Sequence, residues 1–141
     1  MSDVARAQDL YAAFARAELD AVRAAMADDV RWIEPPSLPY GDQVGFDAIL
    51  QNVLMKALAE VEGFSTVPEE WIDGGDRVVV LGRYSGRSVA TGLELDVPFA
   101  HVLRFRDGRL VEFQVHADTH RWLLQVGATS ELTSEADLHP T

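Results

Sequence analysis

The sequence predicts an α+β fold, in which helices pack on one face of a curved, mostly antiparallel sheet. Apolar residues recur at helical spacing up to about Val61, and with a period of two from about Gly63 to Ala117. The glycine-containing segments "DGGDR" and "RDGR" separate the period-two stretches, as is typical of hairpin turns. Helices that precede a run of paired strands favour an α+β arrangement over alternating βαβ units.

The first helix is predicted from its apolar stripe. Val4, Ala7, Tyr11 and Phe14 lie on one helical face. Ser2 directly precedes this stripe and is expected to cap the helix, because its hydroxyl can accept from a free amide of the first turn.

Two further helices are expected before the sheet. A short helix is predicted over about 19–27, followed by a short strand within "ADDVRWIEPP" that the prolines end. After the loop "PPSLPYGDQVG", helix resumes near Phe46. Its apolar face consists of Leu50, Leu54, Ala57, Leu58 and Val61.

Four strands are predicted after the helices, forming an antiparallel meander. Their sequences are "FSTVPEEWID", "RVVVLGRYSGR", "VATGLELDVPFAHVLRFR" and "RLVEFQVHAD". The last strand is expected to lead into a short helix over about 119–126, closed by Gly127. Residues 1–127 are therefore predicted to form a single domain, and the polar, aperiodic residues 128–141 a flexible tail.

The composition limits the classes of partner. The chain has 141 residues, of which 48% are hydrophobic and 25% charged, as expected for one globular domain. There are no cysteines, which excludes disulfides and thiolate metal ligands. The net charge of −11 argues against nucleic acid or an anionic membrane as partner. Without an apolar membrane span or a signal-peptide pattern, a cytoplasmic location is expected.

The strand "VPFAHVLRFR" carries apolar residues on both faces. Helices can cover one face, and an uncovered apolar face favours association. We therefore expect a homodimer that buries the outer face of the sheet. Phe99, Leu103 and Phe105 share a face with His101, and Ala100 and Val102 occupy the other face.

Three segments together resemble the nuclear transport factor 2-like superfamily, most closely its SnoaL-like polyketide cyclase and ketosteroid isomerase-related branch. They are "LYAAFARAELDAVRAAMADDVRWIEPP", "DGGDRVVVLGRYSG" and "VPFAHVLRFRDGRLVEFQVHADT". The resemblance extends over 4–127. It implies a cone-like, strongly curved, mostly antiparallel sheet packed against three N-terminal helices and enclosing an apolar pocket. This fold hosts enzymes, binding proteins and transport factors.

The resemblance also implies roles for four residues. Tyr11 matches a first-helix tyrosine that donates a hydrogen bond to substrate oxygen in the isomerases. Glu34, before Pro35, stands where those enzymes have a catalytic aspartate, and His101 stands where they have a second, acidic donor. Asp118, in "VHADT", matches the acid/base aspartate of the SnoaL-like cyclases. The chain thus combines parts of two patterns.

These groups suit an enzyme that moves protons without a cofactor on an apolar carbonyl compound, as an isomerase, cyclase or dehydratase. The row Gln114, His116 and Asp118 is expected to face the cavity, since alternate residues share a strand face. Burial beside Trp32 is expected to raise the pKa of Glu34. The predicted substrate contacts are Trp32, Phe14, Tyr40, Phe99, Leu103, Gln114 and His116.

Other interpretations remain open at this stage. Tyr11 and His101 suit a hydrogen-bonded core, Glu34 a solvated loop, and Asp118 a helix cap. The alternatives to the acid/base enzyme are a non-catalytic binder of small molecules and an enzyme that opens epoxides through Asp118 and a nearby arginine. A metal held by His116, Asp118 and His120 is not expected, because a helix starting near Thr119 separates their side chains.

Overall fold

The computed structural model describes residues 1–127. Five helices, one π-helical segment and six strands follow one another along this part of the chain. In order they are α1 (Asp3–Ala15), α2 (Leu19–Ala24), β1 (Met26–Ile33), β2 (Gln43–Val44), α3 (Phe46–Ile49), η1 (Leu50–Leu54), α4 (Met55–Glu60), β3 (Val61–Asp73), β4 (Val78–Ser88), β5 (Val97–Arg106), β6 (Arg109–Ala117) and α5 (Thr119–Val126).

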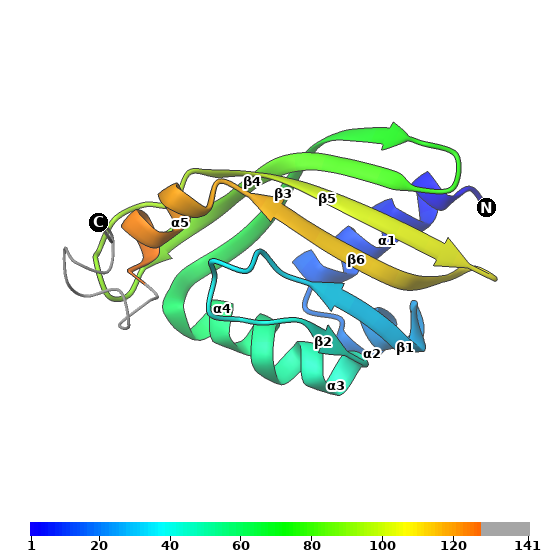
Figure 1. Cartoon of the computed structure of the whole chain (residues 1–141), viewed down its shortest axis with the longest axis horizontal. Helices are drawn as coiled ribbons and strands as arrows, with labels where there is room; N and C mark the ends of the chain where they lie inside the picture. Colours follow the sequence, from blue (N-terminus) through cyan, green and yellow to red (C-terminus); the bar gives the residue numbers. More distant parts are fainter. Residues whose placement is uncertain (128–141) are drawn as a thin grey trace.

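All six strands belong to one sheet, in the order β2-β1-β6-β5-β4-β3. Neighbouring strands are antiparallel except β1 and β6, which run parallel. The sheet is curved and open, α1 lies across it, and α5 lies near its far end (Figure 1). The predicted α+β class, with a mostly antiparallel meander from β3 to β6, is confirmed.

Local chemistry sets the two predicted helix ends. The Ser2 hydroxyl accepts from the amide of Ala5 at 3.1 Å, which confirms the predicted cap of α1. Gly127 ends α5 with a left-handed backbone, φ 64°, where its amide donates to the carbonyl of Leu123. A glycine adopts this conformation without steric penalty.

The third predicted helix is less regular than its apolar face suggested. α3 and α4 are separated by the π-helical segment η1, and β3 begins at Val61 instead of after Gly63. π-helical turns within helices recur at functional sites. Here Leu50, Val53 and Leu54 of η1 line a cavity.

Two predicted boundaries are wrong. The helix expected to reach Ala27 stops at Ala24, because Met26 already pairs with Leu110 of β6. The strand expected from Val89 begins only at Val97, since Gly92 adopts a φ of 74° in a turn. Both differences arise because the local hydrophobic periodicity does not show which strands pair or where the chain turns.

The bend of the sheet depends on close contact between β3 and β4. The pairing of these strands is irregular between Pro68 and Glu70, opposite Gly82. A Cβ atom at Gly82 would lie 2.2 Å from the carbonyl oxygen of Val67, so any larger residue would force the strands apart. The curvature leaves room on the helical side of the sheet for a cavity.

Candidate functional site

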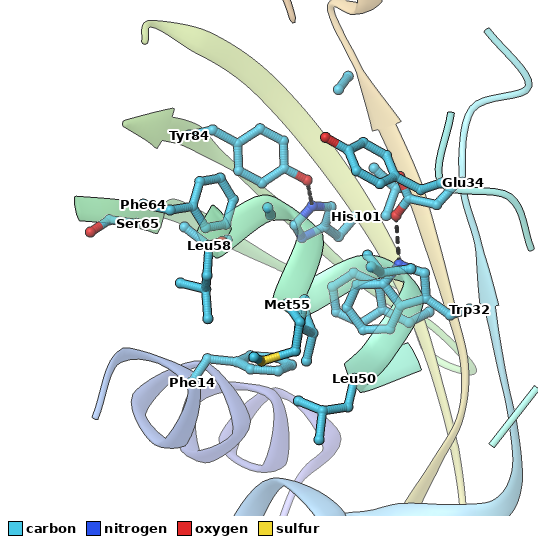
Figure 2. Close-up of a pocket in the computed structure, with 18 of the residues that line it drawn as sticks. Phe14, Trp32, Glu34, Leu50, Met55, Leu58, Phe64, Ser65, Tyr84 and His101 are labelled. Atoms are coloured by element: carbon cyan, nitrogen blue, oxygen red, sulfur yellow. Dashed lines mark hydrogen bonds between the residues drawn. The ribbon is translucent and has the colours of Figure 1, made fainter. Parts of the chain in front are cut away.

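A cavity of about 300 Å³ lies between the sheet and the helices. Its size is at the lower end of the range for small-molecule sites. Exposed lining residues mark its mouth: Leu19, Met55 and Leu58. Figure 2 shows Tyr84, His101 and Glu34 on one side of the cavity, with Phe14 and Leu50 on the opposite side. The cavity therefore has an apolar side and a side that carries polar groups.

His101 links two tyrosines on the polar side. Its Nδ1 lies 2.6 Å from the hydroxyl of Tyr11 on α1, and its Nε2 lies 2.6 Å from the hydroxyl of Tyr84 on β4. The imidazole is 2% exposed and stacks on Phe99, with ring centroids 3.9 Å apart. Both ring nitrogens are occupied, so His101 cannot itself donate to a ligand while these bonds persist.

Burial keeps this cluster neutral. It lowers the pKa of His101 well below its ordinary value, and the Coulombic effect of His116 lowers that pKa further. Burial likewise raises the pKa of the Tyr11 hydroxyl and that of Tyr84. At neutral pH the cluster is therefore two phenols joined by a neutral imidazole.

A count of hydrogens gives the chemical property of this cluster. A neutral imidazole carries one N–H, so it donates to one tyrosine and accepts from the other. The tyrosine that accepts from His101 does not use its own hydroxyl proton in that hydrogen bond. In either tautomer the cluster thus retains one tyrosine O–H that can donate to an oxygen atom in the cavity.

Glu34 is the buried carboxyl group of the site. It follows β1, is 8% exposed, and its Oε2 accepts from the indole N–H of Trp32 at 2.6 Å. Burial raises the pKa of Glu34 to about 7; the Trp32 hydrogen bond opposes the rise and the charge of Asp42 adds to it. The predicted shared orientation of Trp32 and Glu34, and the predicted rise in pKa, agree with this geometry. A carboxyl group of this kind exchanges protons at neutral pH.

The structure brings together six of the residues predicted from the sequence. The cavity is lined by Tyr11, Phe14, Trp32, Glu34, Tyr40 and His101. Phe99 and Leu103, expected as walls, do not line it. They are buried in the core, where the Phe99 ring stacks on the His101 ring.

The predicted orientation of the last strand is wrong. The residues of β6 that line the cavity are Phe113, Val115 and Ala117. Gln114 and His116 instead line a separate outer cleft, together with Asp42 and Glu34. Alternation along the strand is present, but the apolar set faces inward because the cavity wall is itself largely apolar. Glu34 borders both spaces.

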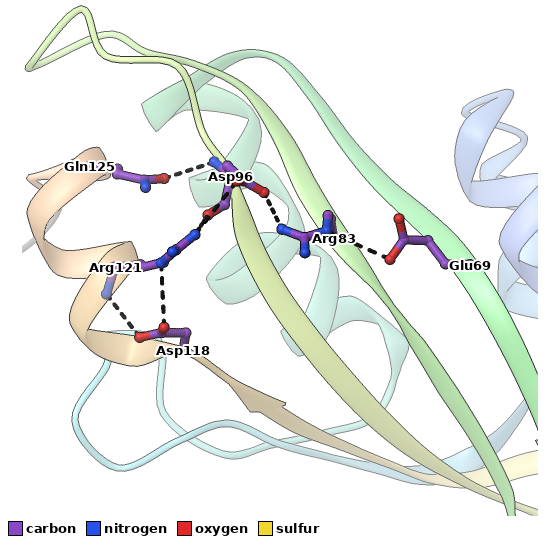
Figure 3. A network of polar contacts seen from close by, with 6 residues as sticks. All are labelled: Glu69, Arg83, Asp96, Asp118, Arg121 and Gln125. Atoms are coloured by element: carbon purple, nitrogen blue, oxygen red, sulfur yellow. Dashed lines mark hydrogen bonds and ion pairs between the residues drawn. The ribbon is translucent and has the colours of Figure 1, made fainter.

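Asp118 is not in the cavity. It caps α5, where its Oδ1 accepts from the amide of Arg121 at 3.1 Å and its Oδ2 lies 3.6 Å from Nε of Arg121. The expectation that its carboxylate points inward is therefore wrong, whereas its alternative role as a helix cap is confirmed. The arginine expected beside Asp118 for epoxide opening is present as Arg121, but the Asp118–Arg121 pair lies at the surface (Figure 3).

Sequence reasoning missed Tyr84 and Trp122. Tyr84 was included in a strand without a role, although it faces the same side as Val80 and the pairing of Val80 with His101 follows from the meander. Trp122 lies in the last helix, which was expected to end the domain and was given no part in the cavity. It is 3% exposed and lines the cavity. Its position four residues after a predicted cap, on the apolar side of α5 with Val126, was the available signal.

Over residues 1–127, no group of three His, Cys, Asp or Glu side chains is placed to hold a metal ion. No helix in this part of the chain is both long and apolar enough to cross a membrane.

Comparisons with known proteins place the fold. A structure of a nuclear transport factor 2-like protein of unknown function from Burkholderia pseudomallei is 34% identical, with a TM-score of 0.80, covering 89% of this chain and 98% of that one. A second protein of this type, from Burkholderia thailandensis, is 30% identical, with a TM-score of 0.83, and 88% and 96% are covered. TerC, crystallised with polyporic acid, is 25% identical, with a TM-score of 0.79, and 88% and 97% are covered.

No curated protein sequence matches the chain. The family model of the SnoaL-like domain, in contrast, matches residues 7–113, which include most of α1 and all of the sheet except the end of β6. This match and the solved structures agree with the resemblance drawn from the sequence. The chain therefore belongs to the SnoaL-like domain family, within the nuclear transport factor 2-like fold.

Proposed function

We propose that this protein is a cofactor-independent acid/base enzyme that enolises a small apolar carbonyl compound. The observation that carries the proposal is the buried Glu34 carboxyl group, with a pKa of about 7, in the same cavity as the Tyr11–His101–Tyr84 cluster. Perturbed carboxyl groups in apolar cavities are candidates for general bases. The SnoaL-like fold includes isomerases and cyclases, which is consistent with such chemistry.

In the proposed reaction, ionised Glu34 removes a proton from the carbon next to the substrate carbonyl. The electron pair moves onto the carbonyl oxygen, and the free O–H of Tyr11 or Tyr84 donates to the resulting enolate. Protonated Glu34 then returns the proton to the same or a neighbouring carbon. His101 is a positioning residue in this scheme: it holds both phenols and selects, through its tautomer, which one donates.

The TerC structure supports the proposed use of the cavity. That protein, of the same fold, was crystallised with an organic molecule, polyporic acid. We propose that this chain likewise binds an apolar, oxygen-bearing compound. The apolar side around Phe14 and Leu50 would hold the hydrocarbon part, and the polar side would hold the carbonyl group.

The test is hydrogen–deuterium exchange at the carbon next to a carbonyl. The probe is 2-tetralone, a bicyclic ketone, followed by proton NMR in heavy water. The wild-type protein is expected to accelerate exchange, and Glu34→Gln to reduce the protein-dependent rate at least about a hundredfold. Asp118→Asn is the control and should leave the rate unchanged, because Asp118 lies outside the cavity.

A non-catalytic binding protein is the rival proposal. It predicts that 2-tetralone binds equally well to wild type and Glu34→Gln, with no protein-dependent exchange in either. The raised pKa of Glu34 favours the enzyme, since a simple apolar binder has no need of a buried carboxyl group. Exchange that persists in Glu34→Gln would contradict the assignment of the base.

The homodimer also stays a prediction. We propose that two copies associate through the outer face of the sheet, to which Ala100 and Val102 of β5 contribute. Sedimentation equilibrium at micromolar concentration should give twice the mass of the chain, and a monomer would contradict it.

A further inference from the structure

Glu34 is a buried carboxyl group without a counter-ion. Its side chain is 8% exposed, and the eight ion pairs of residues 1–127 do not include it. The remaining residues, 128–141, contain neither lysine nor arginine. A buried carboxylate is normally paired, because taking its charge out of water is costly. With a pKa of about 7, Glu34 is partly ionised at neutral pH, so a positive charge beside it would stabilise the charged form.

The carboxyl group keeps one oxygen atom for such a partner. Its Oε2 accepts from the indole N–H of Trp32 at 2.6 Å, whereas no hydrogen bond of residues 1–127 uses Oε1. Protein atoms do not fully enclose Oε1, which therefore remains accessible. Figure 2 shows the Glu34 side chain beside Trp32 on the wall of the cavity. A ligand in the cavity can thus approach the carboxyl group from its unpaired oxygen.

Aromatic rings surround this carboxyl group. Trp32 donates to it, and its charge helps to raise the pKa of Tyr40 and that of Tyr84, so both hydroxyls lie within reach of its field. Among residues 1–127, Glu34 is the one Asp, Glu, Lys or Arg side chain that lines the cavity. A tertiary or quaternary ammonium group held among aromatic rings gains cation–π attraction. The carboxyl group and its wall therefore fit a cation that carries apolar substituents.

The charge of the whole chain acts in the same direction. A net charge of −11 attracts cations and repels anions over long distances. The exposed side chains at the mouth of the cavity, Leu19, Met55 and Leu58, carry no charge that would oppose the entry of a cation. An anionic ligand, in contrast, would meet both the net negative charge and the carboxylate of Glu34.

We propose that the cavity binds a small apolar ammonium compound, whose positive charge pairs with the carboxylate of Glu34 among the aromatic rings. The ligand class is a tertiary or quaternary ammonium. This binding activity goes beyond the proposed reaction and does not depend on proton removal by Glu34. Because the ammonium group would occupy the space next to the proton-accepting oxygen, such compounds are expected to inhibit the proposed reaction.

The test uses two probes of the same shape: [3-(hydroxymethyl)phenyl]trimethylammonium and 3-tert-butylbenzyl alcohol. They differ in one atom, which is a positively charged nitrogen in the first probe and a carbon in the second, and neither can enolise. At pH 8.5, where Glu34 is ionised, isothermal titration should show that the ammonium binds about tenfold more tightly. In Glu34→Gln this preference should fall to about threefold or less, since only the aromatic attraction remains.

Pairing with the cation should also displace a proton at pH 7. The cation lowers the pKa of Glu34, so molecules that hold this proton release it on binding. Titration in two buffers of different ionisation enthalpy should show that about half a proton is released for each ammonium bound, because the pKa of Glu34 is about 7. The alcohol should release none, and the ammonium should release none from Glu34→Gln.

The other titratable groups near Glu34 are controlled in this measurement. On the cavity side, burial keeps His101 and the tyrosines neutral. Asp42 and His116 lie in the outer cleft that Glu34 also borders. Glu34→Gln retains both of these residues, so a proton released from either one would still be observed in that variant.

Two further positions locate the cation. Asp42→Asn keeps the oxygen that accepts from the amide of Glu34 at 3.0 Å and removes the other acidic charge of the outer cleft. The preference for the ammonium should then stay within about twofold of the wild-type value, since exposed charges interact weakly. Tyr40→Phe keeps an aromatic ring on the cavity wall and should keep the preference, whereas Tyr40→Leu should lower it about threefold.

The outcomes separate this inference from the proposed function. It is overturned if the two probes bind equally to the wild type, if neither binds at millimolar concentration, or if the preference is unchanged in Glu34→Gln. Loss of the preference in Asp42→Asn would place the cation in the outer cleft, and full retention in Tyr40→Leu would remove the aromatic contribution; each result overturns the inference as stated. Exchange of 2-tetralone by the wild type judges the proposed reaction independently, so a protein that catalyses exchange without preferring the ammonium contradicts this inference alone.

Discussion

Two polar networks of this molecule contrast in their surroundings. In the cavity, Tyr11, His101 and Tyr84 form a chain of two hydrogen bonds, and Glu34 accepts from Trp32 nearby. On the surface, Arg83 and Arg121 bridge Asp96, with Glu69 and Asp118 at the ends (Figure 3). The surface network has more charges, but its side chains are 39–60% exposed.

The contrast shows that the number of charged groups does not identify a functional site. Water and salt screen exposed ion pairs, so each contributes little to stability and changes little in chemistry. Burial strengthens each interaction of the inner network and shifts the pKa of its members. The surface network joins α5 to β3, β4 and the residue before β5, whereas the inner network lines the cavity.

Glu34→Gln is expected to give the largest effect on stability. The pKa of Glu34 is about 7 in the native state against an ordinary value of 4.5, so the native state holds this proton more tightly than the unfolded chain. The free energy of unfolding of the wild type should therefore fall by up to about 3 kcal/mol as the pH rises from 4.5 to 7. Glu34→Gln removes that loss.

The measurement is urea unfolding of both proteins at several pH values. The variant should be the more stable protein at pH 8, and the difference should vanish near pH 4, where wild-type Glu34 is protonated. A difference that is constant with pH would show that the carboxyl group titrates normally in the folded protein.

His101→Phe should destabilise the inner network next most strongly. It leaves the Tyr11 and Tyr84 hydroxyls buried without their partner, which should lower the free energy of unfolding by about 2 kcal/mol. Adding Tyr11→Phe and Tyr84→Phe to this variant should recover part of the loss, since the unpaired hydroxyls are then removed. Simple loss of packing would instead make the triple variant less stable still.

Asp118 tests the surface network where it caps α5. Asp118→Ala removes the cap of α5 and should lower the free energy of unfolding by about 1 kcal/mol, whereas Asp118→Asn keeps the capping oxygen and should cost less. Neither change should slow 2-tetralone exchange. A rate loss in Asp118→Asn would restore the catalytic role that the sequence suggested for this residue.

Much of the fold could be predicted because its signals are local. The stripe of α1, the cap at Ser2, the hairpin turns and the end of α5 at Gly127 depend on neighbouring residues. The parallel pairing of β1 with β6, the π-helical segment η1 and the start of β3 depend on distant partners. Periodicity carries no information about those partners.

The site was predictable where the resemblance supplied positions, as for Tyr11, Glu34 and His101. The prediction was wrong for Gln114, His116 and Asp118, because their polar side chains were expected to face the cavity. In this protein the cavity wall is mostly apolar, and its polar groups come singly from different elements. The role of Tyr84 could not be read from its strand alone, since it depends on a contact with His101 across the sheet.

The smallest expected effect separates the two networks by salt. Arg83→Gln breaks the ion pairs of Arg83 with Asp96 and Glu69, whose side chains are more than half exposed. The free energy of unfolding should fall by at most about 0.5 kcal/mol in low salt, and the difference from wild type should disappear in 1 M sodium chloride, where charges are screened beyond about 3 Å. The loss in His101→Phe should persist in the same salt, because that network is neutral and buried. Urea unfolding of both variants at two salt concentrations measures the difference, and a salt-sensitive loss in His101→Phe would mean that the imidazole is charged in the folded protein.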